Sequence, residues 1–209
     1  MDDMKEKDKV LTEERILAAA VEEFTLKGYT ATRMQSIADR AKISKSALHY
    51  YYRNKERLFK LVLDKTAGKI LNQLHIDLTE LGSFEEKLEY GFRYYYQAIH
   101  KNIKIIRFVH MELNRNPSLF REFLKKRNIQ NWLSALDIDL NKEYKAGRIR
   151  QISAEQLILN IVSLSIFPHL SRNIVGEVMN LNQQSYQQML QDRENSIMQF
   201  IRHALFIKE

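Results

Sequence analysis

The chain has 209 residues, a formal net charge of +7, two prolines, six glycines and no cysteine. A chain of this length can bury one or two cores, and without cysteine it can form neither a disulfide framework nor a thiolate site. The first ten residues are too charged for a signal peptide, and the longest apolar stretch, 157–170, is too short and too polar for a membrane span. We therefore expect a soluble, cytoplasmic protein with no membrane partner.

The first helix is predicted over residues 12–28. Thr12 is the expected N-cap, the apolar side chains of Ile16, Ala20 and Phe24 recur at helical spacing, and Gly28 ends the pattern. Residues 1–10 carry both signs of charge and are expected to form a frayed arm.

Two short helical patterns follow within residues 32–55. Thr32 is the expected cap of the first and Ser44 that of the second. If Leu48 points inward, one face of the second helix is left facing outward. That face carries Lys45, Ser46, His49 and Tyr50. A cation, a hydroxyl, an imidazole and a phenol can all meet phosphates or base edges, which is how a helix-turn-helix presents its recognition helix.

The charge distribution supports this interpretation. Residues 27–60 contain nine Lys or Arg and two acidic residues, a net charge of +7 that equals the charge of the whole chain. A basic excess confined to the segment that is shaped to read DNA favours nucleic acid as the partner.

This segment resembles the TetR family of bacterial transcriptional repressors, whose N-terminal signature is similar to A-x-x-S-x-x-x-L-x-x-Y-[FY]-x-x-K-x-x-L. Residues 41–58 read AKISKSALHYYYRNKERL, and the similarity extends over residues 12–60. Three positions depart from the family pattern. Lys42 and Ser46 stand where the family often has Gly, and His49 replaces a frequent Tyr that contacts the DNA backbone in the family.

The resemblance and the helical spacing together give a set of candidate DNA contacts. Lys45 and Lys55 are expected to serve phosphates, and Ser46 and Tyr50 to read bases. The full set is Thr32, Arg33, Ser44, Lys45, Ser46, Ala47, His49, Tyr50, Tyr51 and Lys55.

Beyond residue 54 the pattern is helical to the end of the chain. Helices are predicted from residue 55 onward, over 83–101 with a capping box from Ser83 and Glu86, over 103–115, and over 116–147 with Asn116 as the cap. Two more follow, 153–172 with a bend at Pro168 and 183–206. The fold class is thus all-α, about nine helices without a convincing strand. Residues 1–54 are predicted to be a three-helix DNA-binding domain and residues 55–209 a helical effector-binding and dimerisation domain.

An enzyme is not expected, because the sequence has no Gly-rich phosphate loop, no nucleophile elbow and no histidine pair at metal spacing. We expect no cofactor and no metal. The family resemblance instead implies a pocket for a small, largely apolar effector. Its candidate lining is Phe92, Tyr95, Phe108, His110, Trp132, Asn160 and Phe167, and which of Tyr94, Tyr95 and Tyr96 faces the pocket stays open.

The last two long helices carry broad apolar faces, and helices of this kind form a four-helix dimer interface in TetR-like proteins. The candidate interface residues are Leu157, Ile161, Leu164, Ile197, Phe200 and Ile201. The resemblance therefore implies a homodimeric repressor that a small ligand releases from a palindromic operator. The alternative is a DNA-binding dimer without a small effector, either architectural or controlled by a protein partner.

Overall fold

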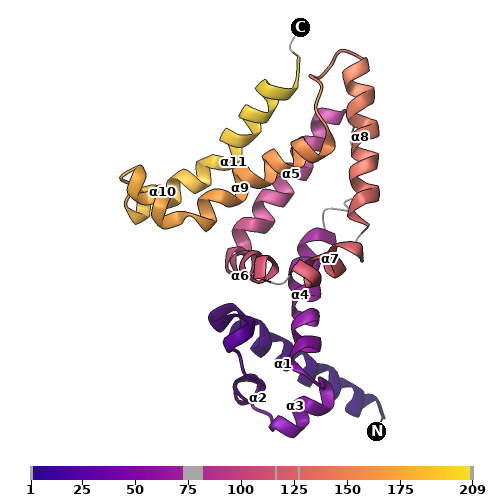
Figure 1. Cartoon of the computed structure of the whole chain (residues 1–209), viewed down its shortest axis with the longest axis vertical. Helices are drawn as coiled ribbons and strands as arrows, with labels where there is room; N and C mark the ends of the chain where they lie inside the picture. The colour runs from indigo at the N-terminus through magenta and orange to yellow at the C-terminus, as the bar shows by residue number, and fades with distance from the viewer. Residues whose placement is uncertain (1, 73–81, 116, 127, 208–209) are drawn as a thin grey trace. The chain divides into compact units, whose positions relative to one another are not determined.

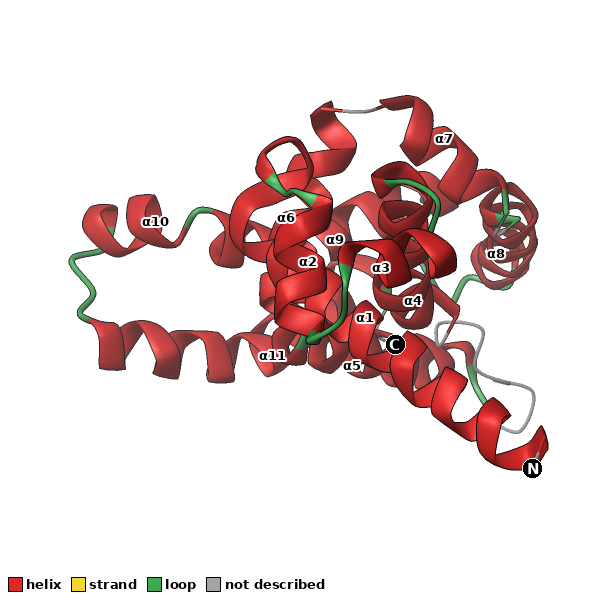
Figure 2. Cartoon of the chain, turned by 90° about the horizontal axis from the view of Figure 1, so that it is seen from below, coloured by secondary structure: helices red, strands yellow, loops and turns green. Residues whose placement is uncertain are grey.

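The computed structural model describes residues 2–72, 82–115, 117–126 and 128–207. Within these ranges the chain forms eleven helices and no strand, only an isolated bridge between Ile149 and Phe206 (Figure 2). The predicted all-α class is confirmed. The helices divide into two compact units, one formed by Met1–Asn72 and Lys104–Phe123 and the other by Gln73–Ile103 and Leu124–Glu209.

The first unit contains α1 (Asp2–Ala31), α2 (Met34–Ala41), α3 (Lys45–Tyr51) and α4 (Lys55–Asn72), together with most of α6 (Ile103–Arg115) and of α7 (Pro117–Lys125) (Figure 1). Helix α1 packs on α2 and α4, and α2 packs on α3. The core of these helices includes the fully buried Ile16, Phe24, Ile37, Leu48 and Phe59. Phe108 of α6 joins this core, with its ring centroid 5.7 Å from Phe59 and 6.4 Å from Phe24.

The second unit contains α5 (Phe84–Lys101), α8 (Ile129–Lys145), α9 (Ala154–Leu170), α10 (Arg172–Val178) and α11 (Gln183–Leu205). Helix α9 lies at its centre and packs against α5, α8, α10 and α11. Its core residues come from all the long helices of the unit, for example Phe92, Leu140, Leu157 and Ile197.

Pro168 shapes the end of α9. A proline has no N–H, so the carbonyl of Leu164 loses its usual helical donor. The guanidinium of Arg193 on α11 replaces that donor, with Nε 3.0 Å from the Leu164 oxygen. The Tyr186 hydroxyl donates to the Pro168 carbonyl at 2.6 Å. After Ser171 the chain turns by 82° into α10, a helix that the sequence pattern did not predict.

Several predicted helix ends are confirmed. Ser83 and Glu86 form the capping box of α5, and the Ser44 and Ser153 side chains accept from the third residue of α3 and α9. Gly28 has φ of 76° and kinks α1 where the first helix was expected to end. Lys42 has φ of 56° and ψ of 47°, so it adopts the left-handed conformation that a glycine would take most easily.

Other predictions about the helices were wrong. Helix α1 begins at Asp2, and Thr12 lies inside it, where its hydroxyl donates to the Asp8 carbonyl. The helix expected over 116–147 is split into α7 and α8, since Asn128 is left-handed with φ of 48° and cannot continue a right-handed helix. The expected cap Asn116 lies outside the described residues.

Candidate nucleic-acid interface

Helix α3 presents the outward face that the sequence predicts. Leu48 points into the core and is fully buried, which turns the opposite side of the short helix to solvent. Lys45, Ser46 and His49 are exposed, and Tyr50 is 83% exposed. A tyrosine exposed in the middle of a polar face can meet a partner with both its apolar ring and its hydroxyl.

Local contacts hold several of these side chains in place. The Ser44 hydroxyl accepts from the Ala47 N–H at 3.0 Å and lies 2.9 Å from the Ser46 hydroxyl. The His49 Nδ1 is 3.1 Å from the Arg53 carbonyl oxygen, and the Tyr50 ring packs edge-on against Tyr51. Side chains that are already ordered lose less conformational entropy when they bind.

The turn between α2 and α3 is fixed from α1. Arg15 donates from Nη2 to the carbonyls of Ala41 and Lys42 at 2.7 and 3.3 Å. These carbonyls belong to the end of α2, where helical acceptors have no intrahelical partner. Arg15 thereby fixes the angle at which α3 leaves α2.

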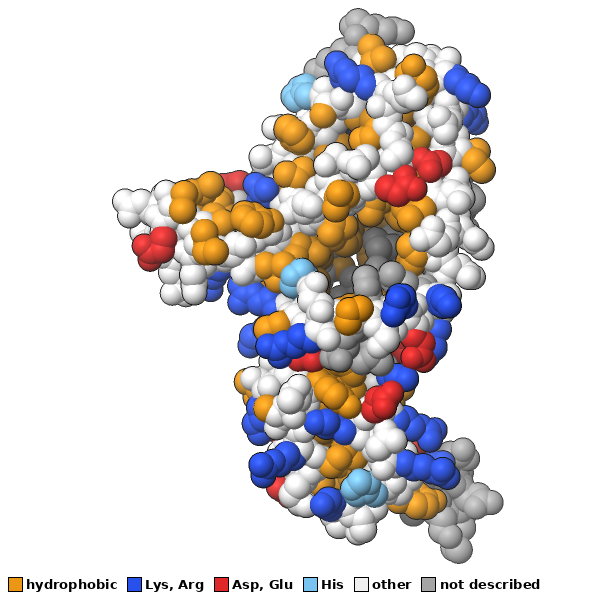
Figure 3. Space-filling view, viewed as in Figure 1, with side chains coloured by type: hydrophobic (Ala, Val, Ile, Leu, Met, Phe, Trp, Pro, Cys, Tyr) orange, Lys and Arg blue, Asp and Glu red, His pale blue; other side chains and the backbone are white. Residues whose placement is uncertain are grey.

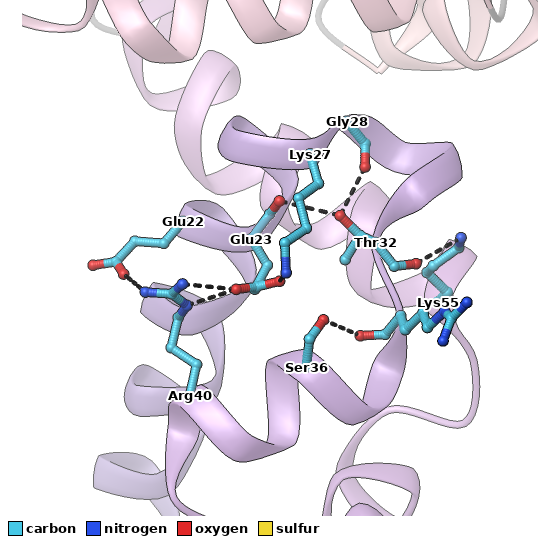
Figure 4. A network of polar contacts seen from close by, with 9 residues as sticks. Glu22, Glu23, Lys27, Gly28, Thr32, Ser36, Arg40 and Lys55 are labelled. Carbon is cyan, nitrogen blue, oxygen red and sulfur yellow. Dashed lines mark hydrogen bonds and ion pairs between the residues drawn. The ribbon is translucent and has the colours of Figure 1, made fainter.

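A second network joins α1 to α2 (Figure 4). The buried carboxylate of Glu23 accepts from Lys27 at 2.6 Å and from Arg40 Nε at 2.9 Å, and Arg40 also bonds Glu22 at 2.7 Å. Burial alone would raise the pKa of Glu23, but the hydrogen bonds from Lys27 and Arg40 outweigh it and lower the pKa to about 2. Glu23 therefore stays ionised at neutral pH and cross-links the two helices.

The ten candidate DNA contacts divide into two groups. Arg33, Ser44, Lys45, Ser46, His49 and Tyr50 are exposed, and Ala47 and Tyr51 are half-buried on the same short helix. Thr32 is 1% exposed, and its hydroxyl donates to the carbonyls of Gly28 and Glu23. Lys55 directs its ammonium group at the carbonyls of Tyr29, Thr30 and Thr32. These last two side chains face into the protein.

The sequence analysis missed Glu112 of α6, which is 1% exposed and accepts from the Tyr29 N–H at 3.1 Å. A signal was present, because Glu112 is four residues from Phe108 and so shares the buried face of α6. A carboxylate on an apolar face needs a polar partner, which identifies it as a residue with a specific contact.

The seven candidate pocket residues are not brought together in one unit. Phe108 and His110 belong to the first unit, where Phe108 is core and His110 is exposed. In the second unit Phe92 is core, Tyr95 and Trp132 are half-buried, and Asn160 and Phe167 are exposed. An open hollow along α11, between Gln184 and Ser196, contains none of the seven.

Among the three consecutive tyrosines, Tyr96 is the buried one and donates to the Leu190 carbonyl at 2.7 Å. Tyr94 and Tyr95 are half-buried, and burial raises the pKa of Tyr95 well above its usual range.

Four of the six candidate interface residues are buried within the protomer. Leu157, Ile161, Ile197 and Ile201 all belong to the core of the second unit. Leu164 is half-buried, and Phe200 is 61% exposed. The sequence pattern predicts a helix that is buried on most sides. It does not show whether the same chain or a partner buries each side.

Two other kinds of site, a metal site and a membrane span, can be assessed within the described ranges. No group of three or more His, Cys, Asp or Glu side chains there is arranged to hold a metal ion. No single described helix combines the length and hydropathy of a membrane span, and only the pair α9 and α10, bent by 82°, passes that test together.

The fold and the α3 face define the class of protein: an all-helical DNA-binding protein whose helix-turn-helix consists of α2 and α3. Lys and Arg side chains are spread over the surface of the first unit (Figure 3), in keeping with a polyanionic partner.

Comparisons with known proteins identify the family. Residues 16–62 match the family described as "Bacterial regulatory proteins, tetR family". The chain is 27% identical over 179 residues to the probable HTH-type transcriptional regulator YttP of Bacillus subtilis, covering 82% of this chain and 83% of that protein.

Two solved structures share the fold. A putative transcriptional regulator from Saccharomonospora viridis, in complex with choline, has a TM-score of 0.67 at 17% identity and covers 93% of this chain and 97% of its own. The regulator FadR of Bacillus subtilis, in complex with stearoyl-CoA, has a TM-score of 0.63 at 19% identity and covers 90% of this chain and 97% of its own. Residues 16–62 therefore carry the DNA-binding segment of the TetR family of bacterial regulatory proteins, and the similarity to YttP extends over most of the chain.

Proposed function

We propose that the protein is a homodimeric repressor that binds a palindromic operator and is released from it by a small, largely apolar ligand. The observation that carries the proposal is the outward face of α3, with its cation, hydroxyl, imidazole and 83% exposed phenol. In this proposal residues 1–54 form the DNA-binding domain and residues 55–209 serve effector binding and dimerisation. A DNA-binding repressor acts in the cytoplasm, where the chromosome lies.

The α3 face, together with the residue before α2, offers two kinds of DNA contact. Lys45, in the first turn, and Arg33, just before α2, supply charge to phosphates. Ser46 and Tyr50 are four residues apart, so they lie above one another on the outward face and are the candidates for base reading. His49 is held by the Arg53 carbonyl and takes the position of the family's backbone-contacting Tyr. Ser44, Ala47 and Tyr51 complete the surface.

Uncovered apolar side chains support dimerisation through α9 and α11. Leu159 and Phe167 of α9 and Phe200 of α11 are each more than half exposed. Large apolar side chains that stay exposed on neighbouring helices indicate a surface that a partner covers. A two-fold dimer would place two α3 helices on half-sites about 34–36 Å apart, one turn of DNA.

The effector proposal is supported by the ligands of the two relatives, stearoyl-CoA for FadR and choline for the Saccharomonospora regulator. Half-buried aromatic side chains of the second unit, Tyr95 and Trp132, are the candidates to meet the ligand. A ligand that prefers the wrong separation of the two α3 helices shifts the population away from the DNA-binding arrangement. The alternative is a dimer without a small effector.

Selection of binding sites from random DNA tests operator binding. We expect an inverted repeat with half-sites about 10 base pairs apart, centre to centre. Tyr50→Phe and Ser46→Ala should change the preferred bases, each by about 1–3 kcal/mol of discrimination. A selection that yields no preferred sequence would contradict operator recognition, and unchanged preferences in both variants would remove these two residues as readers.

Melting temperatures across a panel of acyl-CoA thioesters and quaternary amines test the effector. A ligand at a hundred times its dissociation constant stabilises the folded state by about 2.7 kcal/mol. Stabilisation by one class together with release from the selected DNA supports the repressor mechanism. Stabilisation by none, with DNA binding intact, favours the alternative.

A further inference from the structure

The corner between α1 and α2, residues 28–32, is held by contacts from two other helices. Both polar groups of the Tyr29 backbone are engaged. Its N–H donates to Glu112 of α6 at 3.1 Å, and its carbonyl accepts from Lys55 of α4 at 2.9 Å. We call residues 28–32 with Lys55 and Glu112 the corner clamp.

Lys55 uses its whole donor capacity inside the clamp. An ammonium group has three N–H donors. The ammonium nitrogen of Lys55 lies 2.9, 3.3 and 3.0 Å from the carbonyl oxygens of Tyr29, Thr30 and Thr32. The same nitrogen is 4.5 Å from the centre of the Tyr29 ring. These carbonyls lie at or just beyond the end of α1, where helical acceptors have no intrahelical partner.

Glu112 holds the corner from α6. Its carboxylate is 1% exposed, and a Cβ at position 28 would lie 2.9 Å from its Oε1. Gly28 is favoured by its φ of 76°, which L side chains rarely adopt, and a side chain at this position would also displace the Glu112 carboxylate. Phe108, one turn earlier on α6, packs against both Phe24 and Phe59 and holds the helix that carries Glu112 in place.

Thr32 links the corner to α2 (Figure 4). Its hydroxyl donates to the Gly28 carbonyl at 2.7 Å, and its own carbonyl accepts from Lys55 at 3.0 Å. Helix α2 begins two residues later at Met34, and α3 follows after the Lys42 turn. A shift of the corner would therefore move the start of α2 and, with it, α3, the helix proposed to bind DNA.

We propose that Lys55 and Glu112 are positioning residues for DNA binding: together they fix the corner from which α2 and α3 are aimed, and Lys55 makes no phosphate contact. The functional DNA-binding unit then includes α6, which lies outside the residues matched to the family. The proposal requires that α3 binds DNA, but it requires neither a dimer nor an effector.

The salt dependence of binding separates positioning from phosphate contact for Lys55. Loss of one phosphate contact lowers the slope of log affinity against log salt by about one on every DNA. For Lys55→Met we expect an unchanged slope on both a duplex recovered by selection and a random duplex. Affinity should fall about tenfold, equivalent to about 1.4 kcal/mol, on the selected duplex only. A slope reduced by about one with equal loss on both duplexes would overturn the proposal, as would wild-type binding.

Lys55→Arg keeps the charge and covers the case in which the Met variant does not fold. The guanidinium is longer and planar where the ammonium is compact, so it reaches the three carbonyls only if the corner shifts, although it binds phosphate well. Positioning therefore predicts weaker binding to the selected duplex with an unchanged slope. Full retention of affinity would indicate a phosphate contact and refute the assignment.

For Glu112 the test concerns the side-chain oxygen that accepts the hydrogen bond from the Tyr29 N–H. Glu112→Ala should lose about tenfold in affinity for the selected duplex, and Glu112→Gln, which keeps an acceptor oxygen, should restore most of it. Glu122→Ala is the matched control, because Glu122 is an exposed acid of α7 that pairs with Lys60. Hydrogen exchange of the Tyr29 amide should accelerate in Glu112→Ala and not in Glu122→Ala. Equal behaviour of the Ala and Gln variants, or unchanged exchange at Tyr29, would exclude Glu112 from the clamp.

Discussion

Helix α3 of the first unit and helix α10 of the second expose different kinds of side chain. In the first unit α3 buries Leu48 and turns only polar side chains and Tyr50 outward. In the second unit large aliphatic side chains stay outside, including Ile174 and Val178 of α10 at 66% and 78% exposure. Figure 3 shows hydrophobic side chains gathered over α10. The α3 face is suited to a charged partner, whereas α10 carries apolar surface that its own chain leaves uncovered.

This difference shows when the exposed face of a helix can be predicted from its sequence pattern and when it cannot. A short helix with one inward residue has an unambiguous outside. For a helix such as α9, which is apolar on most sides, only the tertiary structure shows which side chains stay exposed.

The sharpest test of this comparison uses two neighbouring residues of α11. Ile201 is 4% exposed and Phe200 is 61% exposed. We expect Ile201→Glu to unfold the second unit, because truncating a buried Ile costs about 2–5 kcal/mol and a buried unpaired carboxylate adds to that cost. Phe200→Glu should keep the helix content and instead weaken self-association. Circular dichroism and sedimentation separate the outcomes, and a folded monomeric Ile201→Glu would show that Ile201 faces a partner.

Acid should weaken the first unit through Glu23. Its pKa is lowered to about 2 from 4.5, so its contribution is complete above pH 4.5 and is lost as the pH falls toward 2. Because Lys27 and Arg40 are partly exposed, we expect about 1–3 kcal/mol at neutral pH. Urea unfolding of Glu23→Gln should show that deficit at pH 7, and the gap to wild type should narrow toward pH 3. A gap independent of pH would mean that the ionised carboxylate is not the stabilising group.

Charge removal compares the two units directly. Lys45→Ala should lower the salt slope of DNA affinity by about one and weaken binding to all sequences alike. Lys142→Ala, an exposed lysine on α8, is the control in the second unit and should leave the slope unchanged. If both variants lower the slope, DNA contacts are not confined to the first unit.

The smallest effect is expected at Trp132, which is half-buried on α8. Trp132→Phe should lower the free energy of unfolding by about 1 kcal/mol, because it removes part of a ring system that is only half-buried. With stearoyl-CoA as the probe, the wild-type emission should shift if this indole lines the effector site. An untouched emission, together with stabilisation by the probe, would move the search toward Tyr95 and Phe167.

Sequence determined what depends on neighbours in the chain. Ser44, Ser83 and Ser153 each cap a helix through an N–H three residues on, as their residue type and spacing predict. The same pattern was misleading at Thr12, which lies inside α1, and at Thr32, because the N-cap of α2 is Arg33. The α3 face was predictable from the sequence, because the direction of Lys45, Ser46, His49 and Tyr50 follows from helical geometry once Leu48 is buried.

Tertiary structure alone decided the roles that depend on distant partners. Lys55 meets a carbonyl 23 residues away, and the Tyr29 amide meets a carboxylate 83 residues away. No local pattern distinguishes a lysine bound to carbonyls from one free for phosphate, or Ile201 in the core from Phe200 beside it on the surface. Helical spacing determines which residues share a face, but the packing of other helices determines what that face meets.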